Sequence, residues 1–350
     1  MKEEVINSEL KRRRVCAGRG LRMSLENDKI EILCGLKGGK TIGAPITIQV
    51  RNKKNTIDLL LPINKARPGH IDMASAMKFL TPDGRIGAEQ ASARNTVGRV
   101  IAGSMAKLLL EHFAVKVFGY ATQIGHIAAE PGITQRSWDS YFHTWDKNVT
   151  PEWKRLLSQA DRKGDTLGGC FEVTALNVPV GLGDHTHWEN RFDARLSQAI
   201  MAIPAVKGVE IGLGFGYASK SGSQSMDVFT VKNNRPILNK YGGWQRTTNY
   251  AGGIEGGLTN GENIIVRAAV KPIPTLKRPL PTIDLKTKRP AKAQVESSDI
   301  CAVPAASVIG EAVVAFEIAR AFISRFPGQT ISEIIAGFRA YQKQLKKKFG

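Results

Sequence analysis

Residues 252–275 read GGIEGGLTNGENIIVRAAVKPIPT, and this stretch decides the fold class. Over residues 263–271 the side chains alternate with a period of two, which predicts a strand with two different faces. One face carries only apolar residues: Ile264, Val266, Ala268 and Val270. The glycines before this strand permit a close backbone approach to a ligand, and the lysine that ends it can meet an anion.

Strand and helix patterns alternate on either side of this stretch. Residues 46–50 and 171–175 also predict strands, whereas residues 92–114 and 304–326 have helical spacing. A capping box, Thr330-Ile-Ser-Glu333, predicts a C-terminal amphipathic helix with a basic tail within residues 327–350. We therefore expect residues 1–350 to form a single α/β (α+β) domain, with mixed and antiparallel sheet layers covered by helices.

Composition and charge limit the function classes. The 350 residues are 42% hydrophobic and 23% charged, which is ordinary globular usage, and the formal charge of +19 favours an anionic partner. The four cysteines form no Cys-x-x-Cys pair, so we expect a reduced, cytoplasmic protein. No apolar run approaches the ~18 residues of a membrane helix. No nucleic-acid motif with base-stacking aromatics is present, so we expect neither a membrane nor a nucleic-acid partner.

The N-terminal region is rich in arginine. Lys11-Arg12-Arg13-Arg14 is followed by Gly18-Arg19-Gly20-Leu21-Arg22. Guanidinium groups in this density bind phosphate oxygens well, because each presents a fork of donors. A solvated basic arm explains the same residues, and the pattern does not decide between the two.

Two further segments carry candidate anion sites. Arg67-Pro-Gly-His70-Ile-Asp72 holds an arginine, a histidine and an aspartate on one Pro-Gly turn, an arrangement that suits an anion beside a proton donor. Ser92-Ala-Arg94 starts a predicted helix, where free N–H groups favour an anion. The pair in Asp184-His185-Thr-His187 has no companion ligands, so we expect no metal site.

Taken in order, these segments resemble the chorismate synthase family over about residues 10–322. The resemblance rests on the motifs at 67–72, 92–94, 98–103, 203–212, 252–262, 271–275 and 298–306. It implies a single domain with a β-α-β sandwich, assembled as a homotetramer. It also implies loss of phosphate from 5-enolpyruvylshikimate 3-phosphate by 1,4-elimination to give chorismate, in the shikimate pathway of aromatic amino acid biosynthesis. Reduced FMN is the implied cofactor, with NADPH as a reductant.

The resemblance also assigns roles to individual residues. His70 matches a histidine that manages protons, and Asp299 matches an aspartate that assists proton removal. Arg13 and Arg19 match positions for nicotinamide-nucleotide and substrate binding, and Arg67 and Arg94 match ligands of the substrate anion. The positions that match flavin contacts are Gln90, Ala91, Ser92, Ala205, Gly256, Lys271, Pro272, Ile273, Pro274, Thr275 and Ser297.

The sequence departs from the family pattern at three places. The family opens with Gly-Glu-Ser-His-Gly, and no histidine precedes His70 here. Gln90 and Asn95 replace an arginine and a glutamate of Arg-Ser-Ser-Ala-Arg-Glu, and Ser297 replaces the arginine of Arg-Ser-Asp. Each lost charged ligand costs a bound anion about 1.5–3 kcal/mol. Two interpretations follow: an active enzyme whose true start lies upstream of Met1, or a catalytically impaired homologue that retains the fold and anion binding.

Overall fold

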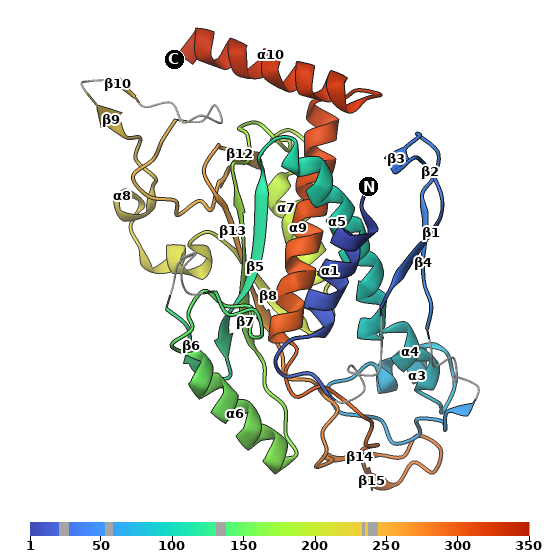
Figure 1. Ribbon diagram of the computed structural model, residues 1–350. Helices are drawn as coiled ribbons and strands as arrows, with labels where there is room; N and C mark the ends of the chain where they lie inside the picture. The colour runs from blue at the N-terminus through green and yellow to red at the C-terminus, as the bar shows by residue number, and fades with distance from the viewer. Residues whose placement is uncertain (21–27, 53–58, 131–137, 233–234, 237–243, 350) are drawn as a thin grey trace. The chain divides into compact units, whose positions relative to one another are not determined.

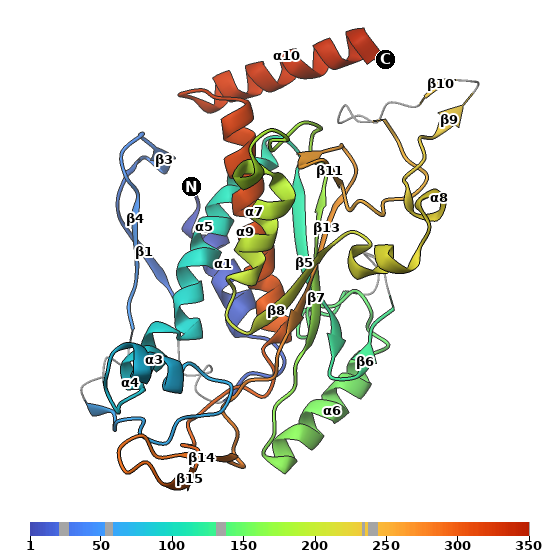
Figure 2. The same cartoon turned by 180° about the vertical axis from the view of Figure 1, so that it is seen from behind.

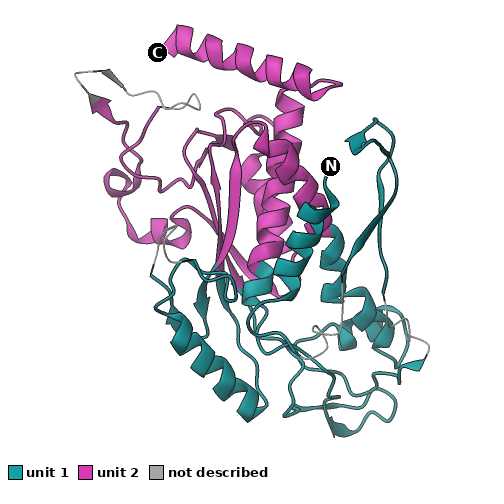
Figure 3. Cartoon of the chain, viewed as in Figure 1, with its two compact units in different colours: residues 1–98, 121–170, 270–306 teal, residues 99–120, 171–269, 307–350 magenta. Residues whose placement is uncertain are grey.

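The computed structural model describes residues 1–20, 28–52, 59–130, 138–232, 235–236 and 244–349. Leu21 and Arg22 of the arginine-rich region lie outside the described residues. The chain forms two compact units, each built from three separate segments, as Figure 3 shows in teal and magenta. Unit 1 comprises residues 1–98, 121–170 and 270–306, and unit 2 comprises residues 99–120, 171–269 and 307–350.

Unit 1 combines short helices with small antiparallel hairpins (Figure 1). Its helices are α1 (Glu3–Arg14), α3 (Asp72–Lys78), α4 (Arg85–Gln90), the 3₁₀ helix η2 (Ala93–Asn95) and α6 (Thr150–Lys163). Its strands are β1 (Ile30–Cys34), β2 (Leu36–Lys37), β3 (Lys40–Thr41), β4 (Thr47–Val50), β6 (Ile127–Ala128), β14 (Pro281–Ile283) and β15 (Pro290–Lys292). β1 pairs antiparallel with β4, β2 with β3, and β14 with β15.

Most of the main sheet belongs to unit 2. The five-stranded sheet has the order β6-β5-β7-β13-β8, in which β5 is Lys116–Ile124, β7 Gly169–Leu176, β13 Ile264–Val270 and β8 Val206–Ile211. The remaining strands are β9 (Val231–Lys232), β10 (Arg235–Pro236), β11 (Ile254–Glu255) and β12 (Leu258–Thr259). The helices are α5 (Thr96–Glu111), η3 (Trp188–Asn190), α7 (Phe192–Met201), η4 (Gly214–Ser219), α8 (Gly222–Ser225), α9 (Val303–Arg325) and α10 (Ile331–Phe349). The expected mixed α/β fold is confirmed.

Residues 252–275 form the strand that their alternating pattern predicts, β13, preceded by a hairpin. β13 buries every second residue, beginning with Ile264 and Val266, which are both fully buried. The glycines before it form the β11–β12 hairpin, where Gly256 and Gly257 both have positive φ. A sheet strand with one fully apolar face must be covered, and helices supply the cover.

In unit 2 the helices α5, α7 and α9 lie beside the sheet, as the two opposite views in Figures 1 and 2 show. Glycines allow this close packing. A Cβ on Gly310 of α9 would lie 2.5 Å from Cε2 of Phe171 in β7, and one on Gly103 of α5 would lie 2.4 Å from Cα of Ala312. Glu311 of α9 is buried and accepts a hydrogen bond of 2.7 Å from the Gly119 N–H.

The C-terminal helix forms as its capping box predicts. The Glu333 N–H donates to Thr330 Oγ1 at 3.3 Å, and the Thr330 N–H donates to Glu333 Oε2 at 3.2 Å. Ile334 and Phe338 are its buried side chains, and Phe338 packs against Phe322 of α9 with ring centroids 5.3 Å apart. Lys346, Lys347 and Lys348 lie in the exposed last turn, where they complement the helix dipole.

The structure corrects one sequence expectation and decides one alternative that the sequence left open. The helix predicted over residues 92–114 begins four residues later, since Ser92 is extended and caps the short η2 before α5 starts at Thr96. The segment Lys11–Arg14 is not a solvated arm, because it is the last turn of α1. Ile6, Leu10 and Arg13 share the buried face of that helix, so the helical repeat carries Arg13 into the interior.

Cys16, Cys34, Cys170 and Cys301 are all free thiols. Within the described part of the chain, no helix combines the length and apolarity needed to cross a bilayer.

Candidate active site

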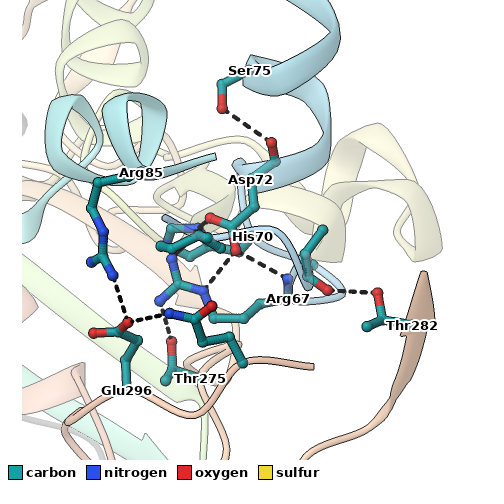
Figure 4. A network of polar contacts seen from close by, with 12 residues as sticks. Arg67, His70, Asp72, Ser75, Arg85, Thr275, Thr282 and Glu296 are labelled. Atoms are coloured by element: carbon teal, nitrogen blue, oxygen red, sulfur yellow. Dashed lines mark hydrogen bonds and ion pairs between the residues drawn. The ribbon is translucent and has the colours of Figure 1, made fainter. Parts of the chain in front are cut away.

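Arg67 and Asp72 form a buried, two-pronged ion pair at the start of α3 (Figure 4). Arg67 Nε lies 2.7 Å from Asp72 Oδ2, and Arg67 Nη2 lies 2.8 Å from Asp72 Oδ1. The backbone N–H of Arg67 also donates to Oδ2, at 3.0 Å. The intervening turn closes through a bond of 3.1 Å from the His70 N–H to the Arg67 carbonyl, with Gly69 at φ +76°. Glycine takes this left-handed conformation without the steric cost of a Cβ.

His70 contacts the same carboxylate. Its Nδ1 lies 2.5 Å from Asp72 Oδ1, and its side chain is 21% exposed. Burial alone would raise the pKa of Asp72, but the hydrogen bonds from Arg67 and His70 outweigh it and hold this pKa well below its usual value. Asp72 is therefore an ionised acceptor, while the imidazole keeps one edge accessible.

The segment after β13 meets this turn within unit 1. Thr275 Oγ1 accepts a hydrogen bond of 3.0 Å from Arg67 Nη1, and Lys271 Nζ donates to the Gly69 carbonyl. The Ile273 carbonyl accepts from Thr166 Oγ1 at 2.7 Å. Pro274 packs near Gly69, and Pro272 is exposed. The structure thus brings Lys271 and Thr275 together with Arg67 and His70, four residues that the sequence analysis selected.

Arg13 and Arg94 share one carboxylate. Arg13 Nη2 lies 2.6 Å from Asp28 Oδ2, and Arg94 Nη1 bonds to Asp28 Oδ1. Arg13 Nη1 also donates to Thr96 Oγ1 at 3.2 Å. Burial, followed by the neighbouring charge of Arg19, lowers the pKa of Arg13. Two guanidinium groups on one carboxylate leave a net positive charge at this point.

Arg19 and Asp299 form a third pair. Arg19 Nη1 lies 2.5 Å from Asp299 Oδ2, and the Gly20 N–H donates to Asp299 Oδ1 at 2.8 Å. Arg19 Nη2 donates to the Arg13 carbonyl at 2.8 Å, which connects this pair to the previous cluster. Burial lowers the pKa of Arg19, but Asp299 more than compensates, so the net shift is upward. The side chain of Asp299 is thus held between two donors.

Exposure separates the arginines by what each can reach. The exposed fraction of the side chain is 2% for Arg13, 8% for Arg67, 11% for Arg19 and 24% for Arg94. Arg13 and Arg67 are buried and form ion pairs with the buried carboxylates of Asp28 and Asp72. Arg94 is the most accessible of the four, so it is best placed to meet a dissolved anion.

The remaining positions that the resemblance predicts to contact flavin are divided between the units. In unit 1, Gln90 ends α4, Ala91 follows it, and Ser92 Oγ accepts from the Arg94 N–H at 3.3 Å. Gln90, Ala91 and Ser297 are exposed, and the Gln90 carbonyl accepts from Asn95 Nδ2 at 2.9 Å. In unit 2, Ala205 precedes β8 at φ +71°, and Gly256 lies at the tip of the β11–β12 hairpin at φ +58°. Ala205 is unusual, because residues with a Cβ rarely adopt this conformation.

Sequence reasoning missed the carboxylate of Asp28 and the pair of Arg85 with Glu296. Arg85 Nη2 lies 2.8 Å from Glu296 Oε1, next to Arg67 in Figure 4. Neither Asp28 nor Glu296 belongs to a motif, so no local pattern marks them. Only the pairing of distant segments places them beside the arginines.

The chain is similar to known proteins over almost its whole length. The family model for chorismate synthase matches residues 1–323, extending beyond the N-terminal limit that the motifs indicated. A chorismate synthase of Geotalea uraniireducens is 44% identical over 364 residues, covering 99% of this chain and 93% of the relative. One from Geobacter sulfurreducens is 42% identical over 362 residues, covering 98% and 92%.

A solved structure agrees. A crystal structure of chorismate synthase superposes with a TM-score of 0.77 at 33% identity, covering 99% of this chain and 91% of that one. The matching extends over both units and over the motifs that hold Arg67, His70, Arg94 and Asp299. The chain belongs to the chorismate synthase family.

Proposed function

We propose that this chain converts 5-enolpyruvylshikimate 3-phosphate to chorismate by 1,4-elimination of phosphate, using the unit 1 residues described above and reduced FMN. The observation that carries the proposal is the arrangement of arginines on fixed carboxylates, with a partly exposed histidine in one of these clusters. The substrate brings a phosphate and carboxylates, so a cationic site with oriented donors suits it. Family membership supports the active enzyme over an impaired homologue.

Each residue has a part in this proposal. Arg94 and Lys271 meet the anionic groups, because both have accessible cationic ends near the fixed clusters. Arg67 orients the turn from inside through Asp72 and Thr275, and its role as a ligand of the substrate anion stays a prediction. His70 holds or moves a proton at Nε2. Asp299 assists proton removal by accepting a proton at its carboxylate, which Arg19 and the Gly20 N–H hold in place.

Two accessible cationic side chains, Arg94 and Lys271, suit an anionic cofactor beside an anionic substrate, whereas the exposed contact positions Gln90, Ala91 and Ser297 are uncharged. Reduced FMN, when bound, would supply electron density for the loss of phosphate, with no net redox change over the reaction. Gln90, Ala91, Ser92, Ser297 and residues 271–275 are the proposed flavin contacts of unit 1, and Ala205 and Gly256 those of unit 2.

The finer details of assembly and location stay predictions from the sequence: a homotetramer, NADPH as reductant and a cytoplasmic location. We also propose that the two units make up one chorismate-synthase-like domain. The support is topological. The helices α5 and α9 and the strands β5, β7 and β13 each have residues in both units, so neither unit is a contiguous piece of chain.

An anaerobic binding titration tests the site. Reduced FMN should bind far better with substrate present than oxidised FMN does alone, as measured by flavin absorbance and fluorescence. Arg94→Gln should weaken substrate binding roughly 10- to 150-fold, because a lost hydrogen bond to a charged group costs about 1.5–3 kcal/mol. Asp28 keeps its bond to Arg13 in this variant, so the cluster retains one ion pair.

The matched control is Arg51→Gln, which removes an exposed arginine of unit 1 that pairs with Glu31. It should leave the dissociation constant unchanged. Equal weakening by both variants would assign the effect to general charge and contradict a site at Arg94. Absence of any flavin signal at high protein concentration would contradict the cofactor.

A further inference from the structure

The geometry points to Asp72 as the positioning residue of His70: we infer that its carboxylate fixes the proton of His70 on Nδ1 and thereby presents Nε2 to the substrate. This inference rests on the proposed function, because it assigns a role within that same site. The resemblance named His70 but gave no role to Asp72.

The first step is the identity of the proton on Nδ1. His70 Nδ1 lies 2.5 Å from Asp72 Oδ1, and Asp72 is completely buried with both oxygens already accepting from Arg67. An ionised carboxylate only accepts hydrogen bonds, so the hydrogen between the two atoms belongs to the imidazole. Nδ1 therefore carries a proton in both the neutral and the cationic ring.

The second step concerns Arg67, whose Nη2 lies 3.1 Å from His70 Nδ1. Both nitrogens are donors once Nδ1 is protonated, so they do not bond to each other. They share Asp72 Oδ1 as a common acceptor, Arg67 at 2.8 Å and His70 at 2.5 Å. Figure 4 shows Asp72 between the two side chains, with Arg67 also held by Thr275. Arg67 thus aims the carboxylate, and the carboxylate aims the imidazole.

The third step is the consequence for proton transfer. The tautomer of a histidine is set by the hydrogen bond that its other nitrogen makes. With Nδ1 occupied, a proton enters or leaves His70 only at Nε2. The imidazole is partly exposed, whereas Asp72 and Arg67 lie behind it.

The charges around the ring are those of Asp72, Arg67 and Lys271, whose Nζ bonds to the carbonyl of Gly69 next to His70. The pair of Arg85 with Glu296 stands behind Arg67. Asp72 is the carboxylate in direct contact with the ring, through Nδ1.

Nitrogen NMR of the unmodified full-length chain gives the first test, since protonated and unprotonated ring nitrogens have distinct shifts. The His70 signal is assigned by its loss in His70→Ala. We expect Nδ1 protonated and Nε2 unprotonated in the neutral ring. A neutral His70 protonated on Nε2 would overturn the inference without any assay of turnover.

Kinetics give the second test. Asp72→Asn should lose the Nδ1–H signature and lower kcat by roughly 10²-fold, the lower range for a misplaced acid–base group. KM should change little, because Asp72 is buried behind the imidazole. Because Asn leaves Arg67 without its buried partner, the double variant Arg67→Gln with Asp72→Asn removes both charges and should show the same tautomer change and the same loss in kcat.

Asp146→Asn is the matched control, because Asp146 is an aspartate of unit 1 that accepts two backbone N–H bonds, from Glu130 and Asn148. It should leave kcat, KM and the His70 signals unchanged. A change of tautomer without a change of kcat would overturn the positioning role. Unchanged turnover in His70→Ala would instead contradict the proposed role of His70, which separates the two failures.

Discussion

Three aspartates of unit 1 form ion pairs with the arginines of the proposed site. Asp28 holds Arg13 and Arg94, Asp72 holds Arg67, and Asp299 holds Arg19. A buried guanidinium without such a partner is strongly unfavourable. Each carboxylate also fixes the direction of the remaining donors. The residues that bind charge are thus oriented before an anion arrives.

Asp28 is the most sensitive of these positions for stability. Asp28→Asn should lower the free energy of unfolding by about 3–5 kcal/mol, because it leaves Arg13 buried and without an opposite charge. Urea unfolding followed by circular dichroism measures this.

The control for that variant is Glu31→Gln, since Glu31 pairs with Arg51 at the surface, where the side chains are 51% and 77% exposed. Its effect should stay below about 1 kcal/mol. A loss at Asp28 no greater than the loss at Glu31 would mean that Arg13 does not need the carboxylate.

Prediction from the sequence works at the residue scale when partners are close along the chain. Arg67, His70 and Asp72 lie on one turn, and their proximity follows from the Pro-Gly pair. Arg19 and Asp299 are 280 residues apart, and Arg94 and Asp28 are 66 apart, so no spacing rule links them. The family resemblance selected three of these four residues but not Asp28.

At the scale of elements, small residues set how closely α5 approaches α9. Gly103 of α5 faces Ala312 of α9, with no room for a methyl group between them. Gly98 lies in the first turn of the same helix and is exposed, and a Cβ there would meet nothing within 4 Å. Close packing therefore requires a glycine at position 103 but not at position 98.

Replacing each glycine by alanine separates packing from helix propensity. Gly103→Ala should destabilise by about 1–3 kcal/mol through overpacking against Ala312. Gly98→Ala should be neutral or stabilise by up to about 1 kcal/mol, because alanine favours the helix. Thermal unfolding of both variants measures this. Equal shifts in Tm of the same sign would contradict the close approach.

The periodicity of the sequence predicts these elements well where burial repeats regularly. β13 and α9 follow their apolar patterns, and Thr330 with Glu333 marks the start of α10. The start of α5 is missed, because the extended Ser92 and the tight turn η2 leave no apolar signature. The sequence pattern also does not indicate the helix α1. Its buried face includes Arg13, at a position that a hydrophobic residue normally takes, so the apolar repeat is interrupted.

For the whole molecule, the sequence predicts the fold class but not the division into two units. Strands such as β7 and β13 have residues in both units, so the boundary follows no linker or change in composition. The proposed site residues divide in the same way, with Ala205 and Gly256 in unit 2 and the arginines in unit 1. Their assignment comes from the resemblance, because no local chemistry marks an alanine or a glycine as a ligand contact.

The excess of positive charge belongs to the same scale. The net charge of +19 predicted an anionic partner, and the family's substrate and cofactor are both anionic. Much of the arginine near the proposed site is nevertheless neutralised by aspartate. In the proposed function, the binding of anions therefore depends on a few accessible cations such as Arg94 and not on the total charge.

Chorismate formation is the most direct test of the account. The full chain is mixed anaerobically with 5-enolpyruvylshikimate 3-phosphate and reduced FMN, and chorismate and phosphate are measured together. We predict that both appear in equal amounts, that oxidised FMN supports no turnover, and that Arg51→Gln behaves as the unmodified chain. A folded chain that binds reduced FMN and substrate but releases neither product would contradict the proposed reaction.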